Sequence, residues 1–410
     1  MRRDKVVEYI KGSLWVVPTL FAVASLALAQ IAMNLDRSLE LGPGLFTFPG
    51  DADSARGILS TIATSMISFT GIVFTITIVA LQLASQQFSP RILRTFFEDQ
   101  KSQYSLGMFV ATFIFALAVL RQIGADPEPL PRLAVGLSIA LVVLTTIVFV
   151  GYLDHMAKSV RISYLIVRIG DETRGVIERF LPSDFSCSAD IERRGEPTIV
   201  RSTKPGVLNE IHIDRLNSLT TQRGCTVQVL PNLGDFVPTG GKLAVVYGAT
   251  DVEHEVRTLL DLGKERTMDQ DVAFGVRQLV DIAVKAISPA INDPTTAVQS
   301  IDQIHDILRR LCGVPLPHRR IYGERVAIHG PTWNGLVNLA CNEIRHFGEG
   351  YMQVARRLKA MLEDLVQHST EERHEVLRTE LELLEVSAMR GFADEPDRRL
   401  ATMRDEQGIG

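Results

Sequence analysis

The sequence predicts a membrane protein in which four transmembrane α-helices are followed by a cytoplasmic α+β part. Three observations lead to this prediction. Of the 410 residues 46% are apolar, and these concentrate in the first 155 or so positions, a skew that one soluble domain does not show. Four stretches in that region are long enough to cross a bilayer. Beyond it, short strand patterns with a period of two precede amphipathic helical patterns.

The four spans follow from length and apolarity. A bilayer core of about 30 Å requires about 20 mostly apolar residues in a helix, because backbone polar groups cannot stay unpaired in hydrocarbon. The candidates are residues 14–33, 58–84, 106–120 and 133–153. A signal peptide could mimic the first of these spans. Its apolar core is longer than that of a cleavable signal, and no small-x-small site follows, so we expect a permanent helix.

The orientation follows from the basic flanks, because Lys and Arg are retained on the cytoplasmic side during insertion. Basic residues cluster before the first span, between the second and third, and after the fourth. The two remaining connections are mainly acidic. We therefore expect a multi-pass protein of the bacterial inner membrane, with both termini in the cytoplasm and the lipid bilayer as its first partner.

The second span carries a polar stripe. Six residues recur at steps that place them on one face of a helix: Thr61, Ser65, Ser68, Thr75, Gln82 and Gln86. Small and hydroxylated residues allow close packing of membrane helices, which is one interpretation. The other is a wet surface, in which copies of this helix surround a pore. The span contains no Asp, Glu, Lys or Arg, which argues against a proton relay or a strongly charge-selective filter.

Two long motifs, one within residues 68–91 and one at residues 288–297, carry a family resemblance. Residues 68–74 read SFTGIVF and residues 80–91 read ALQLASQQFSPR, while residues 288–297 read SPAINDPTTA. With these motifs the chain resembles the bacterial predicted-membrane-protein family known as domain of unknown function 2254. The resemblance covers nearly the whole chain and weakens after about residue 369. It implies an inner-membrane location and no activity, substrate or catalytic residue.

After the membrane domain (1–155), we expect a connecting helix and linker (156–200) in which residues 162–180 are helical. A small β module (201–250) follows, and its strand pattern resembles the barrel-sandwich hybrid of biotinyl and lipoyl carriers. Carriers present a modifiable Lys on a hairpin between their two half-motifs, but residues 213–224 contain no Lys. We therefore interpret the module as structural and expect no cofactor.

The last segment (265–410) is predicted to be a helical domain. Two buried helical faces are expected, and residues 343–366 and 372–388 form further amphipathic helices. Between the first two, Asn292, Asp293 and Pro294 form a motif with a structural explanation. Asp293 is a natural N-cap and Pro294 fits the first helical position. Several carboxylates nearby could instead hold a cation, but their spacing matches no known loop.

Other function classes find little support in the sequence. The net charge is −5 and charges of both signs are mixed along the chain, which gives no basic surface for nucleic acid, so no nucleic-acid partner is expected. The four cysteines, Cys187, Cys225, Cys312 and Cys341, lie far apart and have no metal-ligand spacing, so we expect reduced thiols and no metal site. Neither a phosphate-binding glycine loop nor a catalytic elbow is present, and we expect no enzyme activity.

Two hypotheses remain open. The first is an oligomeric channel or pore for a small ion, built from copies of this chain, with the second helix lining a water-filled path and the cytoplasmic part assembling or gating it. The second is a membrane-anchored scaffold or sensor that conducts nothing.

Overall fold

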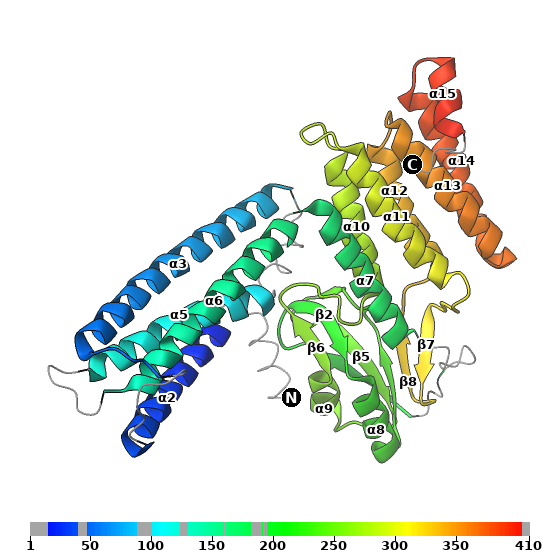
Figure 1. Cartoon of the computed structure of the whole chain (residues 1–410). Helices are drawn as coiled ribbons and strands as arrows, with labels where there is room; N and C mark the ends of the chain where they lie inside the picture. Colours follow the sequence, from blue (N-terminus) through cyan, green and yellow to red (C-terminus); the bar gives the residue numbers. More distant parts are fainter. Residues whose placement is uncertain are drawn as a thin grey trace. The chain divides into compact units, whose positions relative to one another are not determined.

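The computed structural model describes residues 15–39, 47–87, 100–123, 130–159, 161–181, 191, 193 and 195–403, with only the backbone for residues 39 and 84–87. The chain divides into two compact units, Met1–Arg161 and Ile162–Gly410 (Figure 1). Each unit is described separately below.

The first unit contains four apolar helices: α2 (Val16–Leu39), α3 (Ala52–Gln87), α5 (Gln100–Gln122) and α6 (Arg132–Ser159). All four are long and apolar enough to cross a membrane, so the chain is a membrane protein with four candidate spans. The third helix is longer than predicted because polar residues extend it at both ends. One of them, Ser105, bonds back to the Lys101 carbonyl at 2.8 Å.

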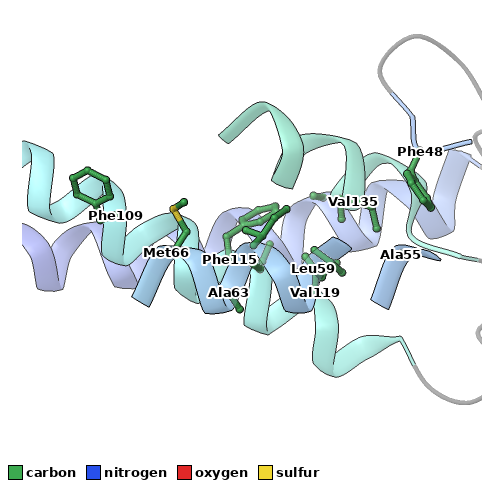
Figure 2. Close-up of a cluster of buried hydrophobic side chains, with 14 of the residues drawn as sticks. Phe48, Ala55, Leu59, Ala63, Met66, Phe109, Phe115, Val119 and Val135 are labelled. Atoms are coloured by element: carbon green, nitrogen blue, oxygen red, sulfur yellow. The ribbon is translucent and has the colours of Figure 1, made fainter. Parts of the chain in front are cut away.

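Helix α5 is central in this unit, since it packs against α2, α3 and α6. Phe115 and Val119 of α5 lie against Leu59, Ala63 and other residues of α3 (Figure 2). Aromatic rings fill one region of the core: the Phe149 ring lies 5.0 Å from that of Phe69 and 5.8 Å from that of Phe109, measured between centroids. Such edge-to-face pairs add to the burial of apolar area.

Polar contacts also join these helices. A hydrogen bond of 2.7 Å links Thr112 of α5 to Thr145 of α6, and another of 2.7 Å links Thr77 of α3 to Tyr152 of α6. The buried carboxylate of Asp36, at the end of α2, accepts hydrogen bonds from the backbone N–H groups of Leu133 and Ala134 at 2.8 and 3.0 Å. Asp36 therefore caps the N-terminus of α6.

The second unit begins with α7 (Ile162–Phe180), which has the predicted bounds. Two sheets follow. The larger has the strand order β1 (Pro197–Arg201), β5 (Lys242–Tyr247), β3 (Thr226–Val229), β8 (Val326–His329) and β7 (Arg319–Tyr322). In the smaller, β2 (Gly206–Ile211) lies between β4 (Phe236–Val237) and β6 (Leu260–Gly263). All strand pairs are antiparallel except β3 with β8.

Three strands, β6, β7 and β8, lie wholly outside the range expected for the β module (201–250), and β1 lies outside it except for Arg201. The segment at the position of a carrier hairpin is a helix, α8 (Ile213–Arg223), and ends at Gly224 with φ +64. A further short helix, α9 (Glu253–Thr258), precedes β6. Apolar side chains from both sheets share one core with Leu216 and Leu219 of α8.

The remaining helices are α10 (Val272–Ala286), α11 (Pro294–Leu311), α12 (Trp333–Phe347), α13 (Met352–His368), the single 3-10 turn η1 (Glu371–Arg373), α14 (His374–Gly391) and α15 (Glu395–Thr402). Helix α7 packs on α10 and α11. The two predicted apolar faces are confirmed, because their members are all buried: Val272, Val276, Leu279, Val280, Ala283 and Ile287 on the first face, and Val298, Ile301, Ile304, Ile307 and Leu308 on the second.

The prediction of one helix over residues 343–366 is wrong, because the chain breaks between α12 and α13. The backbone N–H of Gly348 closes α12 on the Ile344 carbonyl at 2.8 Å, and Gly350 has φ +89, which favours glycine. The helical spacing of apolar residues continues across the break, so the periodicity of the sequence did not reveal it.

Candidate functional site

One face of helix α3 is buried in the protein, and the opposite face is exposed. Its buried residues pack against α5 and α6, as the labelled Ala55, Leu59, Ala63 and Met66 illustrate (Figure 2). The predicted polar stripe lies mainly on the other face. Thr61, Ser68, Thr75 and Gln82 are exposed, Ser65 is half-buried, and the side chain of Gln86 lies outside the described part of the chain.

The exposed face is more regular than the six predicted residues suggest. Eight exposed residues recur alternately at steps of four and three, and we call them the α3 stripe: Gly57, Thr61, Thr64, Ser68, Gly71, Thr75, Ile78 and Gln82. This is a period of 3.5 residues, as in helices that pack along a common seam. Seven of the eight are small or polar, which is typical of close contacts between membrane helices.

The hydroxyl groups of the stripe already have hydrogen-bond acceptors. Each of four bonds the backbone carbonyl four residues earlier: Thr61 at 2.8 Å, Thr64 at 2.9 Å, Ser68 at 3.0 Å and Thr75 at 2.9 Å. A hydroxyl bonded in this way can face lipid, a neighbouring helix or water, because its donor is satisfied within the helix. Gln82 is different, since its amide has no partner among the described side chains.

Two glycines of the stripe lie in open space among the described residues. A Cβ atom placed on Gly57 or Gly71 would meet nothing within 4 Å among the described residues. Glycine within a helix destabilises it by roughly 0.5–1 kcal/mol relative to alanine. The two glycines keep this face flat, although no described residue packs closely enough to require it.

The apolar residues beside the α3 stripe differ in burial. Val73 is buried in the protomer, whereas Ile67 and Phe74 are exposed and Leu81 is half-buried. Ile67 is adjacent to Ser68 and is exposed to 55%. It is therefore the apolar reference position for the stripe.

The second predicted motif lies in the other unit, between α10 and α11. Asp293 is the N-cap of α11: its carboxylate accepts hydrogen bonds from the Thr296 N–H at 3.1 Å and the Thr296 hydroxyl at 2.6 Å. Pro294 occupies the first turn. Asn292 has φ +52, a conformation that Asn adopts more readily than most residues. The motif turns the chain so that the two helices pack together.

We expect Asp293→Ala to lower the stability of the full chain by about 0.5–2 kcal/mol, because the helix loses its cap. Asp293→Ser still offers a capping oxygen and should recover much of the loss. Thermal unfolding of the detergent-solubilised protein measures both. If added divalent metal or a chelator shifts the unfolding of the wild type and leaves Asp293→Ala unchanged, the carboxylate is a metal ligand and the capping explanation is wrong.

The nearby carboxylates form ion pairs. Asp271 pairs with Arg266 at 2.7 Å, Asp281 with Arg277 at 2.6 Å as the i,i+4 spacing predicts, and Asp302 with Arg357 at 2.5 Å. Glu343 also binds Arg277, and hydrogen bonding to Glu343 raises the pKa of this guanidinium. Within the described ranges, no three His, Cys, Asp or Glu residues are grouped to hold a metal ion.

The fold and the α3 stripe define the class of the protein. It is a polytopic membrane protein with one exposed polar helix face and a large α+β part outside the spans. The chain belongs to the family described as "Predicted membrane protein (DUF2254)", whose family model matches residues 11–364.

The chain is also similar to mycobacterial proteins over nearly its whole length. Uncharacterized protein Mb1321c of Mycobacterium bovis and Uncharacterized protein Rv1290c of Mycobacterium tuberculosis are each 29% identical over 419 aligned residues, which cover 97% of this chain and 80% of the relative. No solved structure matches the chain.

Proposed function

We propose that copies of this chain assemble in the bacterial inner membrane through the α3 stripe, and that the assembled stripes line a narrow path for a small ion. The observation that carries the proposal is the exposure of eight regularly spaced residues on a face that the other three helices leave uncovered. The α+β part then assembles or gates the bundle. The proposal assigns the chain no catalytic activity.

Association is favoured by the shape of the stripe. In a bilayer, lipid tails are as apolar as leucine, so helices associate through close packing and interhelical hydrogen bonds. Gly57 and Gly71 provide room for a backbone to approach, since no described residue occupies that space. A second copy of the chain, which brings the same flat face, is the partner that fits it.

A polar path is favoured by the composition of the stripe. The exposed amide of Gln82 is unfavourable against hydrocarbon unless it finds a partner or water. Residues 58–84 carry no charged side chain, so such a path has polar walls without a fixed charge. Weak selectivity between ions of opposite sign is expected.

The orientation belongs to the same proposal. Basic residues before α2, between α3 and α5 and after α6 indicate that these flanks stay in the cytoplasm; examples are Arg2, Arg91 and Arg161. Both termini and the whole α+β part are then cytoplasmic.

Cysteine accessibility tests the path. We expect Ser68→Cys and Thr75→Cys to react with a small membrane-impermeant thiol reagent in intact membranes, whereas Ile67→Cys stays protected. Both Ser68 and Ile67 are exposed in a single copy, so a difference between them requires water on the stripe side only. Equal protection of all three positions would contradict the proposal of a water-filled pore.

The native cysteines interfere little with this experiment. Cys225, Cys312 and Cys341 are buried, and burial raises the pKa of each thiol, so they react slowly. Only Cys187, which lies outside the described residues, has to be replaced, for example by Ser.

A membrane-anchored scaffold or sensor is the second candidate. It is favoured by the internal hydrogen bonds of the stripe hydroxyls, which need no water. Purified protein in liposomes discriminates between the two. A channel gives currents that are lost in Thr75→Leu and Gln82→Leu, whereas a scaffold gives no ion flux above that of empty vesicles.

A further inference from the structure

A cavity of about 250 Å³ lies inside the second unit. Its wall includes residues of the loop between β3 and β4, of strands β7 and β8, and of the first turns of α10 and α12. It is separate from the α3 stripe and from the Asn292 turn.

Most of the wall is apolar. The residues that form this part include Leu181, Ile213, Val272, Ile328, Leu336 and Leu339. An apolar cavity of about 150 Å³ is large enough to hold a benzene molecule. This cavity therefore has space for one ring and a head group.

Two arginines, Arg266 and Arg320, are among the polar residues of the wall, and each guanidinium packs closely against a glycine. A Cβ on Gly330 would lie 2.8 Å from the guanidinium carbon of Arg320, whose side chain is 5% exposed. A Cβ on Gly234 would collide with the guanidinium of Arg266. In both places a side chain on the glycine would displace the guanidinium.

The charged side chains of the wall balance one another. Arg266 is balanced by Asp271, which also caps α10 through the Phe274 N–H at 3.0 Å. Burial raises the pKa of Asp271, and the hydrogen bond from Arg266 opposes this effect. Asp235 accepts from the Asn232 N–H at 2.8 Å in its own turn. Two arginines and two aspartates thus cancel, which leaves little attraction for a dianion.

The helix ends and a neutral histidine complete the site. The N-termini of α10 and α12 both reach the cavity, and helix N-termini favour negative charge. The α12 N-cap is the uncharged Thr332, so no carboxylate of its own neutralises that end. His329 donates from Nδ1 to the Leu230 carbonyl at 2.9 Å in its neutral form, and burial lowers its pKa.

We propose that this cavity binds a small organic monocarboxylate, with a ring-sized apolar body against Ile328 and Leu336 and its carboxylate between Arg320 and the N-terminus of α12. The planar guanidinium matches a carboxylate in geometry. The ligand joins the β7–β8 hairpin to α10 and α12. This site is independent of ion conduction, because no residue of α3 takes part in it.

Fluorine NMR of the full chain in nanodiscs tests the site with para-fluorobenzoate and para-fluorophenylacetate as probes. The neutral primary amide of each probe is the matched control. We expect saturable line broadening for at least one carboxylate, and at least about tenfold weaker binding of its amide, a factor that corresponds to about 1.4 kcal/mol.

Three variants locate the binding. Arg320→Met removes the cation and Ala273→Leu fills the cavity from α10, so each should weaken carboxylate binding at least about tenfold. Arg319→Met is the control. Arg319 directly precedes Arg320 in β7, so its side chain points to the opposite face of the strand. Thermal unfolding verifies that each variant is folded. If Arg320→Met does not fold, the binding measured with Ala273→Leu decides the test.

The proposal is overturned if neither carboxylate binds saturably to the wild type. It is also overturned if carboxylate and amide bind equally, or if binding is unchanged in Ala273→Leu. A loss in Arg319→Met equal to that in Arg320→Met would place the binding elsewhere.

Discussion

Replacing Arg373 with Met should destabilise the second unit by about 3–4 kcal/mol, since several hydrogen bonds from a charged group are lost together. The guanidinium donates to the carbonyls of Leu311, Cys312 and Val314 at 2.6, 2.8 and 2.5 Å. These are the carbonyls at and just beyond the end of α11. Arg373 therefore neutralises the negative end of that helix.

The same guanidinium lies 4.8 Å from the centre of the Trp333 ring, so Arg373 also connects α12 to this junction. Burial lowers the pKa of Arg373, although an arginine remains charged at pH 7. Met preserves the apolar stem and removes every donor. Lys preserves the charge but cannot reach three acceptors with a planar fork, so we expect an intermediate loss.

Urea unfolding of the full chain in detergent, followed by tryptophan fluorescence, measures this effect. The chain has two tryptophans, and Trp15→Phe leaves Trp333 as the only reporter. Arg378→Met, at an exposed position in α14, is the matched control and should change stability by less than about 0.5 kcal/mol. Equal midpoints for Arg373→Met and Arg378→Met would contradict the assigned role.

In the membrane unit, Asp36→Ala should lower stability by about 2–3 kcal/mol, because two buried N–H groups lose a charged acceptor. Asp36 is 3% exposed and caps α6 from a different helix. The residue directly before α6 is Pro131, whose side chain has no acceptor oxygen, so α6 cannot cap itself there.

Asp36→Asn retains one acceptor oxygen and should lose about half as much. Thermal unfolding of the detergent-solubilised full chain compares these variants with Asp53→Ala. Asp53 is an acidic residue of the same unit with an 88% exposed side chain, paired only with Arg56 of its own helix among the described residues. Such surface pairs contribute about 0–1 kcal/mol. A loss in Asp53→Ala as large as in Asp36→Ala would exclude a specific cap.

Local sequence determined the four spans, the buried faces of α10 and α11, and the Asp293 cap. Each of these depends on residues within one or two helical turns of each other, so periodicity and capping chemistry are sufficient. The same local rules missed the break at Gly348, because the apolar spacing on its two sides happens to continue in phase.

The tertiary structure decided which of the local features are free for function. The sequence placed Thr61, Ser68, Thr75 and Gln82 on one face of a helix, but only the packing of α3 on α5 and α6 shows that this face is uncovered. Asp36 was expected in a connecting loop and instead meets α6 across 97 residues of sequence. The cavity beside Arg320 likewise joins segments from residue 180 to residue 339. Such contacts depend on how the whole chain buries its apolar surface, and no local pattern specifies them.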